Sequence, residues 1–107
     1  MLSITPRQVP GATILDIKGR IDTKTCDAFE KEVALLIEAG STRLLLNCAD
    51  LEYISSAGLR VFLLVSRKPG VKLALFSVRP AIAEIISLTG LQALFPIYST
   101  EAEALAA

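Results

Sequence analysis

Two short apolar segments constrain this chain more than any other feature of its sequence. Residues 43–48 (RLLLNC) and 71–77 (VKLALFS) are almost entirely hydrophobic, as expected of central strands that are covered on both faces. A helical pattern follows each of them, from Ser55 or Ser56 to about Lys68, and from Pro80 to about Leu88. The alternation of strand and helix predicts an α/β fold.

The remaining segments extend this pattern toward both ends of the chain. Residues 4–9 and 13–18 predict two strands joined at Pro10-Gly11, and residues 95–98 predict a last short strand before a weak C-terminal helix. We expect residues 1–107 to form one α/β domain, with a mixed sheet of four or five strands and about four helices. A further helix, which ends at Gly40, is predicted by an apolar stripe at helical spacing: Cys26, Phe29, Val33, Leu36 and Ile37.

The charges exclude several classes of partner. Eleven Lys and Arg residues balance eleven Asp and Glu residues, with no block of either sign. We therefore expect no binding to nucleic acid or to a membrane surface. The longest aliphatic or aromatic run, residues 61–65, is far shorter than the ~20 apolar residues of a membrane-spanning helix. The first residues also lack the layout of a secretory signal, so the expected location is the cytoplasm.

The reactive residue types argue against catalysis. The chain has no histidine, which removes the usual catalytic triads and most zinc sites. Cys26 and Cys48 are 22 positions apart and form no CxxC motif. We interpret both as apolar packing residues in a reducing compartment, with a disulfide as the alternative. The sequence therefore predicts a protein that is not an enzyme and has no cofactor or metal of its own.

Polar residues follow three of the predicted strands. Loops that leave parallel strands lie on one rim of a sheet, where ligands and partners of open α/β sheets bind. We expect residues 19–24, 49–56 and 77–80 to meet at this rim. They contribute Asp22, Thr23, Thr25, Asp50, Tyr53, Ser55, Ser56, Ser77 and Arg79.

The segment that ends one strand and starts the second helix carries the most specific signal. The first N–H groups and the dipole of a helix would stabilise a phosphate attached to Ser55 or Ser56, and Gly58 would leave room for the backbone of a partner. Taken alone, these residues favour the simpler interpretation, in which the serines are only N-caps worth ~1 kcal/mol.

Two motifs favour phosphorylation over simple capping. Gly19-Arg20-Ile21-Asp22 with Thr25, and the later Ser55-Ser56-Ala57-Gly58-Leu59, lie in an order of strands and helices that resembles the STAS domain, in particular the bacterial anti-sigma factor antagonists. The similarity runs from about Ile4 to Ala102. In that family a kinase that is also the anti-sigma factor phosphorylates a serine in the second motif. The unphosphorylated antagonist binds this kinase and frees its sigma factor.

The resemblance assigns roles to individual residues. It implies phosphorylation of Ser56, with Ser55 as second choice, and implies as partners an anti-sigma factor/serine-protein kinase and a PP2C-type phosphatase. It implies these contacts with the partner: Asp22, Thr23, Thr25, Ser55, Ser56, Ala57, Gly58 and Arg60.

Other functions remain as alternatives. In a structural STAS subunit, such as the small partner of a lipid-transport ATPase, the same helix would dock permanently and Ser56 would be only part of a cap. A small hydrolase or redox enzyme is disfavoured by the lack of histidine and of paired cysteines. Direct nucleotide binding is disfavoured because the chain has no Gly-x-x-x-x-Gly-Lys loop.

Overall fold

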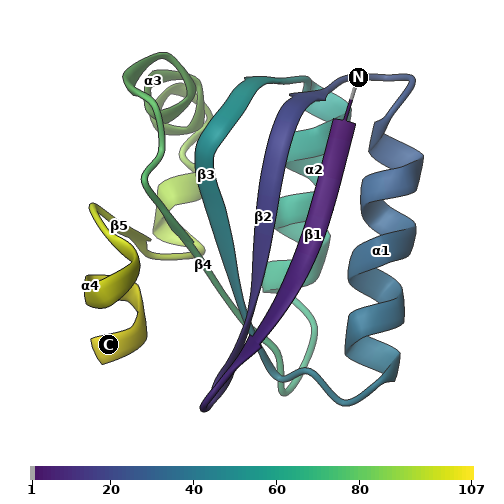
Figure 1. Cartoon of the computed structure of the whole chain (residues 1–107). Helices are drawn as coiled ribbons and strands as arrows, with labels where there is room; N and C mark the ends of the chain where they lie inside the picture. The colour runs from purple at the N-terminus through teal and green to yellow at the C-terminus, as the bar shows by residue number, and fades with distance from the viewer. Residues whose placement is uncertain (1) are drawn as a thin grey trace.

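The computed structural model describes residues 2–107 as one mixed sheet with helices on both faces (Figure 1). The strand order is β1-β2-β3-β4-β5; β1 and β2 are antiparallel, and all other neighbours are parallel. The elements are β1 (Leu2–Val9), β2 (Ala12–Ile21), α1 (Cys26–Glu38), β3 (Arg43–Ile54), α2 (Ser56–Ser66), β4 (Lys72–Phe76), α3 (Pro80–Thr89), the 3-10 helix η1 (Leu91–Ala93), β5 (Ile97–Tyr98) and α4 (Glu101–Ala106).

The two faces of the sheet are covered unequally. Helices α1 and α2 lie side by side behind the sheet in Figure 1, and with α3 they enclose the larger core. Phe62 of α2 lies at its centre, with ring centroids 5.7 Å from Phe29 and 6.1 Å from Phe95. The opposite face carries a smaller cluster beneath α4, in which Ala104 is fully buried. Within residues 2–107 no helix is long and apolar enough to cross a membrane.

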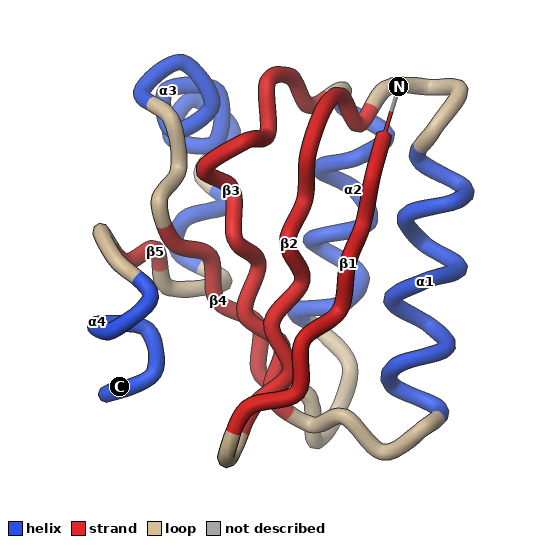
Figure 2. The backbone as a smooth tube through the Cα atoms, in the orientation of Figure 1, coloured by secondary structure: helices blue, strands red, loops and turns tan. Residues whose placement is uncertain are grey.

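The structure confirms the α/β class and both expected central strands, and it corrects the lengths of two strands. β2 continues past Lys18 to Ile21, and β3 continues past Cys48 to Ile54. The extended ends pair with each other through two register shifts, which accompany the bend of β3 in Figure 2. A bulge breaks the period-two alternation of side chains, so the sequence pattern of these ends resembles a loop.

The other differences are small. The short helix η1, between α3 and β5, was not expected from the sequence. The last strand pairs at two residues only, since Phe95 turns into the larger core and Pro96 has no N–H with which to continue the ladder. The predicted helix ends differ from the observed ones by one or two residues, as is usual for frayed termini.

Candidate functional site

The ends of β2 and β3 bring the starts of two helices together. Ile21 pairs with Ile54 in the last register of the two strands. Just beyond this pair, the Ser55 N–H donates to the Ile21 carbonyl at 2.8 Å. The turn that leads into α1 and the first residue of α2 therefore leave the sheet at the same place. This confirms the meeting of the first two predicted rim segments, although much of each segment is strand.

Ser55 is the N-cap of α2, and its hydroxyl oxygen makes the capping hydrogen bond. Its backbone is extended, and its Oγ accepts a hydrogen bond from the Gly58 N–H at 3.1 Å. Its carbonyl accepts the Leu59 N–H at 3.0 Å, which begins the helical ladder. The residue is only 7% exposed. The Ser55 hydroxyl is therefore buried and already engaged.

Ser56 has a different environment, although it is the next residue. It is the first residue of α2 and its side chain is exposed. Arg60, one turn later, is exposed as well, while Ala57 is half-buried. No acidic side chain occupies the first turn of α2. The exposed hydroxyl therefore lies at the positive end of the helix dipole, where no carboxylate of that turn offsets the positive charge.

Gly58 requires a correction. The sequence interpretation left its surface free for a partner, but the residue is buried in the first turn of α2, on the side that faces the sheet. A Cβ atom built on it would lie 2.7 Å from Ile21 Cγ2 and 2.9 Å from Ile54 Cγ1. Glycine is required here because the backbone of α2 packs directly on the ends of two strands. Gly58 sets the distance between helix and sheet and offers no surface to a partner.

The turn before α1 is organised by Asp22. Its Oδ1 accepts the backbone N–H groups of Lys24 at 2.9 Å and Thr25 at 3.1 Å. Its own N–H donates to Thr25 Oγ1 at 2.9 Å, and the Thr25 hydroxyl donates to the Arg20 carbonyl at 2.8 Å. Desolvation raises the pKa of Asp22, but the hydrogen bonds from Lys24 and Thr25 outweigh it and hold the pKa below its ordinary value. The exposed residues of the turn are Thr23 and Lys24.

The third rim segment joins the second through Arg79. The Arg79 Nε donates to the Ala49 carbonyl at 2.9 Å, which ties the start of α3 to the bulged part of β3. The Ser77 hydroxyl instead contacts the Ser99 carbonyl at 3.4 Å, away from the helix starts. Ser77 therefore belongs to the β5 side of the molecule.

The structure also shows a rim contact that the sequence interpretation missed. The guanidinium carbon of Arg20 lies 4.4 Å from the ring centroid of Tyr53, and these two residues are cross-strand partners. Tyr53 is 37% exposed. Tyr53 had been placed in a loop, and only the register of β2 with β3 could have revealed its partner.

The remaining chemistry of the described residues is sparse. Cys26 is half-buried and Cys48 is buried, and both thiols are free. Burial raises the pKa of Cys48 to about 12, so this thiol stays protonated at neutral pH. Within residues 2–107 no cluster of three potential metal ligands occurs. The arrangement at the rim is suited to contact with another molecule through hydroxyls and charges.

Comparison with known proteins identifies the family. The STAS domain family model matches residues 3–104. BtrV of Bordetella bronchiseptica, which is named as an anti-sigma factor antagonist, is 31% identical over 99% of this chain and 94% of its own length.

Two solved structures share the fold. An anti-sigma factor antagonist from Mycobacterium paratuberculosis superposes with a TM-score of 0.91 at 24% identity, over 99% of this chain and 92% of the other. SpoIIAA of Bacillus, a cell fate determinant solved in its phosphorylated form, superposes with a TM-score of 0.73 at 17% identity, over 97% of both chains. From the matched residues and the shared fold it follows that this chain belongs to the STAS domain family.

Proposed function

We propose that this protein is an anti-sigma factor antagonist in a phosphorylation-controlled partner switch. Its unphosphorylated form binds an anti-sigma factor that is also a serine-protein kinase. Phosphorylation of Ser56 releases that partner, and a PP2C-type phosphatase restores the binding form. The protein acts as a regulatory, non-enzymatic partner in the cytoplasm, and the nucleotide and metal belong to the kinase and the phosphatase.

The observation that carries the proposal is the contrast between adjacent serines. Ser56 is exposed at the first position of α2, whereas Ser55 is buried and accepts the Gly58 N–H. A kinase can reach the Ser56 hydroxyl without disturbing the helix, but phosphorylation of Ser55 would break the cap. The name of BtrV supports the role of antagonist, and SpoIIAA, which shares the fold, has been solved in a phosphorylated form.

The electrostatics of α2 explain how such a switch would work. A phosphate adds about −1.5 to −2 charge at pH 7. At the start of α2 this charge is locally favourable by ~0.3–1 kcal/mol, so the free domain keeps its fold. In an interface the same charge must be desolvated, and the cost exceeds the local gain unless the partner supplies a cation. Phosphorylation therefore weakens binding without unfolding the protein.

The contact surface we propose surrounds Ser56. It consists of Asp22 and Thr23 in the turn before α1 and of Ala57 and Arg60 on α2. Thr25 and Ser55 contribute indirectly, because their hydroxyls hold the two turns in shape.

Phosphate mapping tests the acceptor. The purified chain is incubated with ATP, Mg²⁺ and a candidate kinase, for which a histidine-kinase-type ATPase is sought among the genes beside its own. Intact-mass and peptide analysis should find one phosphate in the wild type and in Ser55→Ala, and none in Ser56→Ala. Phosphate that persists in Ser56→Ala and maps to Ser55 would overturn the assignment.

A binding measurement tests the switch itself. Ser56→Asp should weaken the complex with the kinase while the free variant melts as the wild type does. Ser87→Asp places the same charge on an exposed residue of α3 and serves as the matched control. Undiminished affinity of Ser56→Asp, in a stoichiometric complex indifferent to ATP, would favour a permanently docked structural subunit instead.

A further inference from the structure

The edge of β4 is only partly covered by β5. The two strands pair at Leu75 and Phe76, where the Leu75 N–H donates to the Pro96 carbonyl at 3.0 Å. The Lys72 N–H points the other way and donates to the Thr42 carbonyl at 2.8 Å. Because backbone groups alternate along a strand, the N–H and C=O of Leu73 face the β5 side. In the part of the chain that the structure describes, neither group has a hydrogen-bond partner.

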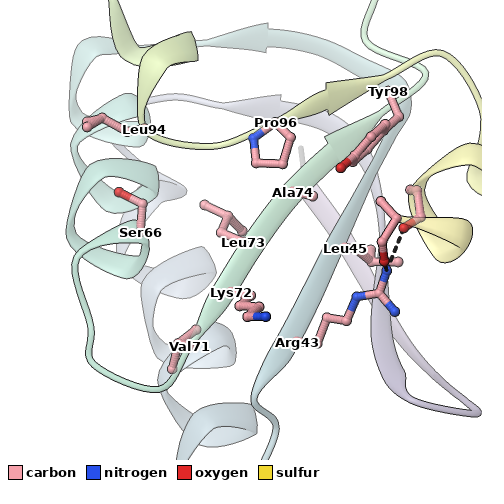
Figure 3. Close-up of a pocket in the computed structure, with 12 residues that line it drawn as sticks. Arg43, Leu45, Ser66, Val71, Lys72, Leu73, Ala74, Leu94, Pro96 and Tyr98 are labelled. Carbon is pink, nitrogen blue, oxygen red and sulfur yellow. Dashed lines mark hydrogen bonds between the residues drawn. The ribbon is translucent and has the colours of Figure 1, made fainter.

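A hollow of about 500 Å³ lies against this open edge and reaches both faces of the sheet. In Figure 3, Ser66 and Val71 lie on one side of the β4 ribbon, and Leu45 and Tyr98 lie on the other. Pro96 closes the hollow at the point where β5 begins. An extended segment placed there would continue β5, and its alternate side chains would enter the two halves of the hollow.

The charged side chains that line the hollow are both positive. Arg43 and Lys72 both line it and are register partners on neighbouring strands, an arrangement that is destabilising for like charges. The Arg43 guanidinium donates to the Ala104 oxygen at 2.6 Å, the Leu105 oxygen at 3.3 Å and the Ala107 oxygen at 3.0 Å, which holds α4 against the sheet. No Asp or Glu lines the hollow, and among residues 2–107 neither Arg43 nor Lys72 forms an ion pair with an Asp or Glu side chain.

We propose that this open edge of β4 binds an extended, acidic segment of a partner protein, which adds a strand beside Leu73. The segment would accept the Leu73 N–H, and its carboxylates would face Arg43 and Lys72. Pairing with a second copy of this chain through the same edge would bring two such pairs of cations together, so charge disfavours it. The contact lies apart from the start of α2 and does not depend on Ser56.

A designed peptide tests the site directly. The probe is acetyl-Glu-Val-Glu-Val-Glu-Val-Glu-amide, titrated into the ¹⁵N-labelled chain and followed by amide spectra and hydrogen exchange. The Leu73 amide should exchange freely without peptide and at least about tenfold more slowly with it. The amides of Lys72 and Leu75, which already have partners, should keep their exchange rates. A Leu73 amide that is already protected, or that stays unprotected at saturation, would overturn the proposal.

Two controls separate strand addition from simple charge attraction. A peptide of the same sequence, with N-methyl groups on alternate backbone amides along the pairing edge, cannot approach β4 closely and should not protect Leu73. Lys72→Glu should weaken peptide binding by about threefold to tenfold, whereas Lys31→Glu, a matched reversal on α1, should not. Equal binding of the methylated peptide, or displacement of the peptide by inorganic phosphate at low millimolar concentration, would instead indicate a general anion site and reject strand addition.

Discussion

The starts of α1 and α2 lie side by side at the end of the same strand pair, yet they are built differently. The turn into α1 is exposed and organised by the carboxylate of Asp22, and Asp27 adds a second acid in the first helical turn. The start of α2 is buried around the Ser55 cap, packs directly on the sheet through Gly58 and has no acid in its first turn.

This difference determines at which of the two helix starts an added negative charge is expected to be tolerated. At α1 the positive end of the helix already has carboxylates of its own, so a further negative charge would be repelled. At α2 the rigid parts are buried and uncharged, and the exposed hydroxyl of Ser56 stands outside them. A helix start held by packing can receive a charge at its surface and keep its position. Three predictions test this comparison.

The largest effect is expected at Gly58. A Cβ atom there would meet Ile21 and Ile54 at less than 3 Å, so Gly58→Ala should lower the free energy of unfolding by about 1–2 kcal/mol. The loss is expected although alanine is the better helix former by about 1 kcal/mol. Gly58→Arg should cost about 3 kcal/mol or more. Urea melts give these values.

The control for this prediction lies two residues earlier. Ser56→Gln adds a longer side chain at an exposed position of the same turn and should change stability by less than about 0.5 kcal/mol. If Gly58→Ala were as stable as the wild type, the contact between α2 and the sheet would be loose, and the contrast with α1 would fail.

An intermediate effect is expected at Ser55. Ser55→Ala leaves the buried Gly58 N–H without its acceptor and should cost about 1 kcal/mol. Ser55→Thr keeps a hydroxyl and should retain most of the stability. Thermal melts of both variants beside Ser56→Ala would separate the two serines. Equal losses in Ser55→Ala and Ser56→Ala would mean that both hydroxyls are structural.

The smallest effect is expected at Asp22 and depends on pH. Asp22→Asn keeps an oxygen for the Lys24 and Thr25 amides but removes the charge. Because the folded pKa lies below the ordinary value, ionised Asp22 adds stability above a pH of about 4, and this contribution is lost as the pH falls through the folded pKa. The wild type should therefore be slightly more stable at pH 7, and the difference should vanish in acid.

The difference in stability between the wild type and Asp22→Asn reports on the Asp22 charge alone. Asp16, whose pKa is also lowered despite its desolvation because Arg7 and Asn47 donate to it, titrates in both proteins and cancels. A stability difference that stayed constant between pH 7 and pH 3 would show that the Asp22 charge plays no part in the turn.

Local patterns predicted most of the architecture correctly. The apolar runs around Leu45 and Leu75 are central strands, and the stripe through Phe29 and Val33 is a helix with those residues buried. The start of the second helix at Ser55 and Ser56 was also predicted correctly. Each of these features depends on residues within a few positions of one another, so periodicity and capping preference are enough to find them.

Features that depend on distant residues were missed or misjudged. The extended ends of β2 and β3 depend on two register shifts, one just before the pair of Lys18 with Asp50 and one just before the pair of Arg20 with Tyr53. A bulge has no local periodic signal, so the sequence placed these residues in loops. The open edge beside Leu73 depends on how far β5 extends, which Phe95 decides by turning into the core.

By itself the sequence determined the order and type of the elements and the segment that carries the candidate site, because backbone preference and hydrophobic period act over a few residues. Only the tertiary structure decided that Ser55 is buried and Ser56 exposed, and that Gly58 faces Ile21 and Ile54. The reason is that burial depends on which surface of a helix meets the sheet, and that surface includes residues more than thirty positions away along the chain, such as Ile21.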